Sequence, residues 1–196
     1  MEASVKEILV ASLLGDGWLT SLSGKKETST YFVKYHSKNV DYLLWLRNQV
    51  IQLSPSELKA TPRYPQYYFY TKARKDIGEL RKLFYPKGRK IIPDDIEHLL
   101  NTPKALAIWY QDDGTLDKRF KYHFNAMFAT YCFTYEECCK LAKMLAANFG
   151  IQASVCKCRM RGKMYFRLYI VSKSMELFIK IIKPYIHPVF NYKISL

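Results

Sequence analysis

One short pattern occurs twice in this chain and constrains its fold more than any other feature. Residues 9–17 read Leu-Val-Ala-Ser-Leu-Leu-Gly-Asp-Gly, and residues 106–114 read Leu-Ala-Ile-Trp-Tyr-Gln-Asp-Asp-Gly. Each is a short apolar stretch that ends in Asp-Gly, and about half of the 196 residues separate Asp16 from Asp113. A repeat at this spacing predicts a chain made of two similar halves.

The rest of the pattern predicts the same order of elements in each half, which we place at residues 1–97 and 98–196. A helix carries the repeated motif, and strands and further helices follow, so we predict an α+β fold in which helices cover one face of each small antiparallel sheet. The first half has predicted strands at 30–36 and 66–71 and helices at 40–53 and 75–84; the second has strand pairs within 118–131 and 154–172, the latter turning near Gly162, and helices at 135–149 and 175–182.

Two predicted helices carry recognisable end signals. Thr134 with Glu137 three residues later forms a capping box, and Gly150 follows where a helix would end. Thr102 precedes Pro103 at the start of the second motif helix, which is the arrangement that an N-cap and a first-turn proline favour.

Composition limits the classes of protein to which the chain can belong. It has 31 Lys+Arg against 17 Asp+Glu, a net charge of +14, with 49% hydrophobic residues. The apolar content is enough for a packed core, and the charge favours a polyanionic partner such as nucleic acid. No apolar run reaches the roughly 20 residues of a membrane span, so we expect no membrane association. The apolar run at 8–14 is short and bordered by acidic residues, which makes a poor signal peptide.

Five cysteines, none in a CxxC pair, favour a reducing intracellular compartment with no disulfide framework and no zinc site. A bacterial or archaeal cytoplasm and an organelle such as a mitochondrion or chloroplast fit equally well. The cysteines are Cys132, Cys138, Cys139, Cys156 and Cys158.

The two aspartates predict a metal site if the motif helices pack side by side. Two carboxylates about 5 Å apart would repel by roughly 3 kcal/mol at an effective dielectric constant of about 20, and the helix C-termini add partial negative charge. A hard divalent cation would relieve this repulsion, and Mg²⁺ suits a site of one or two carboxylates with water and phosphate oxygens. On a basic protein, this arrangement predicts metal-assisted phosphodiester hydrolysis. A single Asp-Gly pair is usually only a turn, so the inference depends on the repeat.

These motifs resemble those of the LAGLIDADG homing endonucleases, in particular the single-chain members with two pseudo-symmetric halves. The resemblance covers nearly the whole chain and is strongest at residues 103–114, with further similarity at 183–186 and at Tyr192-Lys193. The first motif differs from the family pattern at Ser12 and Leu14 but keeps the Gly-Asp-Gly ending. The resemblance implies two αββαββα halves, sheets that form a DNA-binding saddle, and motif helices packed at the interface between the halves.

The resemblance also implies roles for individual residues. Asp16 and Asp113 would bind Mg²⁺, for which Mn²⁺ could substitute, at the DNA backbone, while Gly15 and Asp112 would each lend a backbone carbonyl. A basic residue from each half, Lys90 and Lys193, would polarise water or stabilise charge on the phosphate. The protein would act as a monomer in intron homing, cutting double-stranded DNA at one site and leaving 3′ overhangs.

Strand alternation predicts which side chains of the second half face the DNA. Met164, Phe166, Leu168 and Ile170 form an apolar face, so the intervening residues point outward. On the preceding strand we expect Cys156, Cys158 and Met160 to point inward. The residues predicted to face the DNA in this half are Lys157, Arg159, Tyr165, Arg167 and Tyr169, with Arg161 and Lys163 at the turn.

In the first half, Tyr31, Val33 and Tyr35 are predicted to point into the core. The remaining basic residues near the hairpins are expected mainly to hold phosphates. The outward residues are then Thr30, Lys34 and His36, and the phosphate-binding set is Lys25, Lys26, Lys118, Arg119 and Lys121.

Two other functions fit the same scaffold. An RNA-binding maturase would help a host intron to fold without cutting DNA, and a non-catalytic regulator would only bind DNA. Both readings predict that the acidic positions are free to change, whereas Asp16 and Asp113 are both present. We therefore predict a DNA endonuclease, with a maturase as the alternative.

Overall fold

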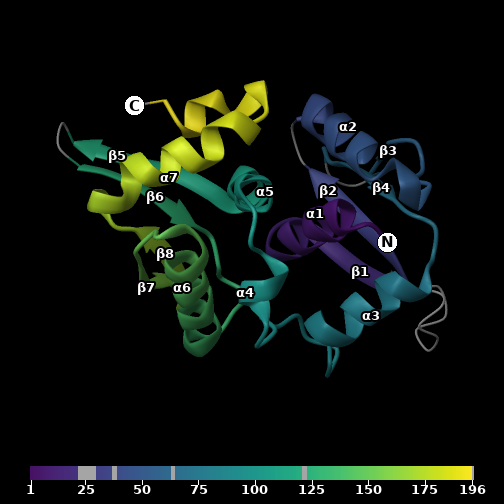
Figure 1. Cartoon of the computed structure of the whole chain (residues 1–196), viewed down its shortest axis with the longest axis horizontal. Helices are drawn as coiled ribbons and strands as arrows, with labels where there is room; N and C mark the ends of the chain where they lie inside the picture. The colour runs from purple at the N-terminus through teal and green to yellow at the C-terminus, as the bar shows by residue number, and fades with distance from the viewer. Residues whose placement is uncertain (22–29, 37–38, 63–64, 121–122, 196) are drawn as a thin grey trace. The chain divides into compact units, whose positions relative to one another are not determined.

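The computed structural model describes residues 1–21, 30–36, 39–62, 65–120 and 123–195 (Figure 1). Some predicted DNA contacts cannot be placed on it. Lys25, Lys26 and Lys121 lie outside the described residues, and for His36 and Arg119 only the backbone is described.

Two compact units make up the chain, Met1–Arg89 and Lys90–Leu196. The segment before the second motif belongs to the second unit because it is bonded to the long helix there. The Asn148 side chain donates to the carbonyl oxygens of Glu97 and Leu100 at 2.8 and 2.9 Å. The division therefore falls before the boundary between residues 97 and 98 that the repeat suggested.

The first unit runs helix, two strands, helix, two strands, helix, with a 3₁₀ turn after its second helix (Figure 1). Its sheet is antiparallel with strand order β1-β2-β4-β3. The elements are α1 (Ala3–Leu14), β1 (Gly17–Ser21), β2 (Thr30–His36), α2 (Val40–Gln49), η2 (Ile51–Leu53), β3 (Lys59–Ala60), β4 (Tyr67–Tyr70) and α3 (Lys75–Phe84).

The second unit repeats this order after one additional short helix, and its antiparallel sheet has the equivalent strand order β5-β6-β8-β7. The predicted α+β class, with an αββαββα order in each half, is confirmed. The elements are α4 (Ile96–Leu99), α5 (Pro103–Asp113), β5 (Gly114–Phe120), β6 (His123–Phe128), α6 (Tyr135–Phe149), β7 (Ala153–Met160), β8 (Lys163–Ile170), η3 (Ser172–Ser174), α7 (Met175–Ile182), η4 (Lys183–Tyr185) and η5 (Pro188–Lys193).

In each unit the core lies between one face of the sheet and the helices. Phe32 and Phe69 from the first sheet are fully buried, with ring centroids 6.1 Å apart. In the second unit the buried Phe128 stacks on Trp109 at 4.0 Å and meets Phe178 edge-on at 6.0 Å. None of the helices in the described ranges is both long enough and apolar enough to cross a membrane.

The structure buries two residues of β2 that the sequence predicts to face outward, while Val33, predicted to face inward, is buried as expected. Thr30 and Lys34, predicted to point outward, are 2% and 0% exposed. They lie on the same face as Phe32, which the helices cover, whereas Tyr31 is half-buried on the opposite face. Alternation shows which residues share a face but not which face is covered. Tyrosine fits either side of a half-buried sheet, so it was a poor guide.

The faces predicted for β7 are also wrong. Cys156 is the cross-strand partner of Arg167, and Cys158 is the partner of Tyr165, so these thiols share the open face of the sheet. Lys157 pairs with Phe166 and therefore lies on the opposite face, as does Arg159. Lys157 and Arg159 are nevertheless exposed.

Local signals explain where the motif helix and the long helix of the second unit begin and end. The Thr102 side chain accepts from the backbone N–H of Ala105 at 3.2 Å, as expected for an N-cap. Both hydrogen bonds of the capping box at Thr134 and Glu137 are present. Gly150 ends α6 in the left-handed conformation, at φ +67°.

We predict that Thr134→Ala lowers the free energy of unfolding by about 1 kcal/mol, because it leaves a helix N–H without its acceptor. Urea denaturation followed by circular dichroism measures this change. Lys143→Ala, on the exposed side of the same helix, is the control and should change the value by less than about 0.5 kcal/mol. Equal effects of the two substitutions would contradict the capping role.

Candidate active site

The second motif aspartate lies where a helix passes directly into a strand. Asp113 is the last residue of α5, and Gly114 begins β5. A Cβ atom on Gly114 would lie 2.0 Å from the Tyr110 ring and 2.3 Å from its carbonyl oxygen. The Asp113 carbonyl oxygen accepts from the Ala129 N–H at 3.0 Å. Asp113 is therefore held at a tight junction that only glycine allows.

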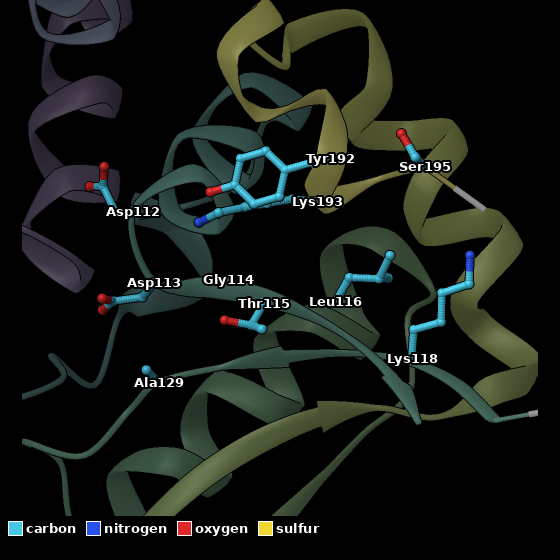
Figure 2. Close-up of a pocket in the computed structure, with 10 residues that line it drawn as sticks. All are labelled: Asp112, Asp113, Gly114, Thr115, Leu116, Lys118, Ala129, Tyr192, Lys193 and Ser195. Carbon is cyan, nitrogen blue, oxygen red and sulfur yellow. The ribbon is translucent and has the colours of Figure 1, made fainter. Parts of the chain in front are cut away.

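A cavity of about 560 Å³ opens at this junction. Figure 2 shows the half-buried Asp112 and Asp113 at one end of it and Lys118 at the other. The C-terminal segment contributes Tyr192 and Lys193 to its lining. The cavity thus combines two carboxylates with basic side chains, as a site for a cation and a phosphate would require.

Lys193, which belongs to the C-terminal segment, is hydrogen-bonded to the end of the motif helix α5. Its side chain is only 9% exposed, and Nζ donates to the Gln111 carbonyl oxygen at 2.7 Å. In return, the Tyr110 hydroxyl donates to the Lys193 carbonyl oxygen at 2.9 Å. Burial, with a smaller contribution from Tyr192, raises the pKa of Tyr110, so its phenol stays protonated as a donor. The ammonium of Lys193 thereby stabilises the negative end of α5.

Lys90 is the first residue of the second unit, and its charge acts on the Cys132 thiol. The pKa of the Cys132 thiol is raised mainly by desolvation, while Lys90 lowers it and Asp113 raises it. Of the predicted catalytic residues, Asp113 and Lys193 line the same cavity of the second unit.

The first motif has the same local construction. α1 ends at Leu14, Gly15 follows as its C-cap, and the exposed Asp16 precedes the strand that begins at Gly17. A Cβ atom on Gly17 would lie 2.6 Å from the Ser12 carbonyl oxygen. Both motif aspartates are thus held between a helix end and a glycine that has no room for a side chain.

The donor atoms at these junctions suit a hard cation. Each junction offers a carboxylate with backbone carbonyls at a helix end, where partial negative charge gathers. Nowhere in the described ranges do three or more His, Cys, Asp or Glu side chains form a group that could hold a metal ion. Mg²⁺ needs only one or two carboxylates, because it keeps water and takes phosphate oxygens as ligands.

The open face of the second sheet carries a mixed polar and aromatic set. Arg167 lies 5.1 Å from the centre of the Tyr169 ring, and its buried Nε has no hydrogen-bond acceptor among the described residues. A buried guanidinium N–H without an acceptor is costly, and because Arg167 as a whole is only half-buried, the rest of its guanidinium can meet an acceptor such as a base edge or a phosphate. Tyr165, Cys156 and Cys158 are on the same face.

The open face of the first sheet has aromatic residues that sequence reasoning assigned to the core or did not select. Tyr31 and Tyr70 meet edge-on at 6.0 Å and line a cavity of about 760 Å³ with Lys72. Lys59 donates to the Tyr70 hydroxyl at 3.1 Å, which raises the pKa of Lys59. Lys59 is on a two-residue strand, too short to produce a detectable alternation. Trp18, next to the first motif, is 47% exposed.

Three other predicted DNA contacts are exposed. Lys118 lies at the end of the cavity described above. Arg161 and Lys163 flank the tight turn between β7 and β8, where Arg161 and Gly162 have φ values of +49° and +78°.

Comparison with known proteins identifies the family. The family model described as "LAGLIDADG DNA endonuclease family" matches residues 6–178. The chain belongs to this family. A relative in Debaryomyces hansenii, "Cytochrome b mRNA maturase bI2", is 32% identical over 207 residues, which cover 100% of this chain and 75% of that protein. The chain spans about half, 48%, of the maturase of the same name in Saccharomyces cerevisiae.

Solved structures support the same fold. The homing endonuclease I-WcaI bound to its DNA recognition sequence has a TM-score of 0.82 at 23% identity, covering 100% of this chain and 87% of that chain. A more distant neighbour, I-DmoI in complex with DNA and Mn, has a TM-score of 0.54 at 11% identity and covers 92% of this chain and 96% of that chain. These likenesses confirm the arrangement of helices and strands.

We predict that Tyr110→Phe lowers the free energy of unfolding by about 1 kcal/mol, because the buried Lys193 carbonyl loses its donor. It should also speed amide hydrogen exchange at residues 190–194, because the C-terminal segment is held less firmly to α5. Tyr185→Phe is the control, since Tyr185 is 40% exposed. Unchanged exchange in Tyr110→Phe would show that this hydrogen bond does not hold the segment.

Proposed function

We propose that this protein is a site-specific DNA endonuclease that uses Mg²⁺, or Mn²⁺ in its place, to hydrolyse one phosphodiester in each strand. The observation that carries the proposal is the cavity in which Asp113 and the buried Lys193 meet at the end of α5. The equivalent Asp16 junction in the first unit supplies the second motif. The family and the DNA-bound neighbour I-WcaI support the same activity.

The chain's residues have separate tasks in this reaction. Asp16 and Asp113, with the carbonyls of Gly15 and Asp112, would hold the cations, which when bound would supply charge neutralisation at the phosphate and activation of water. Lys193 and Lys90 supply fixed positive charge for the negative charge that develops on the phosphate. The junction glycines keep the carboxylates at the helix ends, so little rearrangement is needed when DNA arrives.

The open sheet faces hold the duplex in this proposal. A two-stranded ribbon fits the major groove, where Arg167 is suited to donate to a guanine edge and neighbouring side chains to read other bases. Lys118, Arg161 and Lys163 are suited to phosphates because they are exposed at strand and turn ends. As a monomer, the protein would apply one unit to each half of the target and leave staggered 3′ overhangs.

A second function, assistance of host intron RNA folding, is favoured by one observation. The relative in Debaryomyces hansenii is named a cytochrome b mRNA maturase and matches the full length of this chain. Splicing of a host intron RNA, assayed in vitro with and without the protein, tests this activity. A maturase should retain it when the motif aspartates are replaced.

We predict that Asp16→Asn and Asp113→Asn each reduce double-strand cleavage more than about 100-fold while DNA binding persists, because a cation ligand is lost but the sheets remain. A supercoiled plasmid library incubated with Mg²⁺ identifies a cleaved plasmid, on which cleavage and gel-shift affinity are then measured. Glu176→Gln, an exposed carboxylate on α7, is the control for loss of one negative charge. Full cleavage by both aspartate variants would exclude the catalytic assignment.

The faces of the second sheet give a matched pair of variants. Arg167→Ala should weaken binding of the cleaved duplex about tenfold or more and lower the slope of log affinity against log salt by about 1 if Arg167 contacts a phosphate. If Arg167 contacts a base, the loss should instead depend on sequence. Lys157→Ala removes the same charge from the opposite face and should have a smaller effect. An equal effect of both would show that the open face is not the binding face.

A further inference from the structure

Lys34 is fully buried, which is unusual for a lysine because removing its charge from water costs free energy. Its side chain is 0% exposed, although it is on a strand of a small sheet. A buried ammonium costs several kcal/mol unless other charges or dipoles compensate it. The function of Lys34 must therefore be sought in the core of the first unit and not on the DNA-facing surface.

The strand register places Lys34 at the first motif. Its cross-strand partner is Gly17, the residue that directly follows Asp16. Partners in an antiparallel pair project to the same face, with Cβ atoms about 5 Å apart. That face at Gly17 is covered by the last turn of α1, because a Cβ there would lie 2.6 Å from the Ser12 carbonyl oxygen. Lys34 therefore leaves the sheet beneath the negative end of the motif helix.

The second unit shows that the fold does not require a charge at this place. Phe128 is the partner of Gly114 and stacks on Trp109 at 4.0 Å. Ser12 precedes Gly17 by the same number of residues as Trp109 precedes Gly114. The first unit thus has Ser12 and Lys34 where the second has an aromatic stack, and a neutral pair could fill this space.

The second unit instead brings its buried ammonium from another element. Lys193 comes from the C-terminal segment and donates to the Gln111 carbonyl in the last turn of α5. The two units therefore each bury one lysine at the C-terminal end of a motif helix, Lys34 from β2 and Lys193 from η5. The predicted pairing of Lys90 with Lys193 did not include Lys34.

We propose that Lys34 is a positioning residue for Asp16, the first unit's counterpart of Lys193. Its ammonium offsets the partial negative charge at the C-terminus of α1. The Lys34 charge therefore helps to set the electrostatic potential at the Asp16 carboxylate. This inference rests on the proposed function in one respect, that Asp16 binds a cation. It predicts that loss of the Lys34 charge affects one motif and spares the other.

Terbium binding tests the electrostatic part without any DNA. Tb³⁺ is a hard ion whose luminescence is sensitised by a nearby tryptophan, and Trp18 is two residues from Asp16. In an Asp113→Asn background, which leaves the first motif as the site, Lys34→Met should tighten Tb³⁺ binding about threefold or more because a repelling charge is lost. Lys34→Arg should restore the original affinity. Lys6→Met, which removes an exposed charge from α1, is the matched control.

Strand-specific cleavage tests the positioning part. On a cleaved plasmid from the library, with each strand end-labelled separately, Lys34→Met should slow cutting of one strand at least about tenfold and accumulate nicked circles. Lys193→Met should slow the other strand. A side chain that merely fills the core would slow both strands together and lower the melting temperature in parallel. Lys34→Gln replaces Lys34→Met if the latter does not fold.

Two results would overturn the proposal. The first is that Lys34→Met binds Tb³⁺ no more tightly than Lys6→Met does. The second is that Lys34→Met slows the cutting of both strands equally. Failure of the nuclease assignment is distinguishable. In that case the wild type cuts no DNA in the library, while the Tb³⁺ measurement still decides whether the Lys34 charge acts on Asp16. Loss of the Tb³⁺ signal in the Asp16→Asn, Asp113→Asn double variant locates the signal at the motifs.

Discussion

The close contact between a helix end and the first residue of a strand determines the rest of this architecture. At Gly17 and at Gly114 a Cβ atom would lie 2.6 and 2.0 Å from the preceding helix, distances that no side chain can occupy. The chain therefore turns from helix to strand within two residues at most, and the aspartate before each glycine stays at the negative end of the helix. On the proposed function, cation affinity would follow from this position, because the carboxylate, the carbonyls and the helix dipole are all negative at one point.

The two units place positive charge near the negative end of the motif helix with different residues. In the second, Lys193 reaches the α5 carbonyls from outside the sheet, and Trp109 with Phe128 completes an aromatic core. In the first, Lys34 occupies the register position of Phe128 and is buried in the core. The repeated backbone is thus compatible with either an aromatic or a charged side chain beneath the motif helix. In each unit one buried lysine accompanies the motif helix, from the C-terminal segment in the second unit and from β2 in the first.

Sequence reasoning located the elements better than the faces. The bounds of β2, α3, α6 and α7 match the predictions, because apolar periodicity and end signals such as Thr134 and Gly150 are local. Local patterns do not determine which face is covered, because register depends on partner strands: Cys156 shares a face with Arg167 only through their pairing. The short strands β1 and β3 and the helix α4 have too few residues to show a period. The cavity at Asp113 requires the C-terminal segment, which returns to α5 from about 80 positions away.

Differences between the two open faces matter for what a single chain can recognise. If both sheets carried the same side chains, two units of equal topology would favour a target with two identical half-sites. The first face presents Tyr31 and Tyr70 with Lys59, whereas the second presents Arg167 and Tyr165 beside two thiols. Aromatic hydroxyls and a guanidinium suit different base-edge patterns. On the proposed function, the same backbone repeat therefore reads a target whose halves differ in sequence, which two copies of one half could not do.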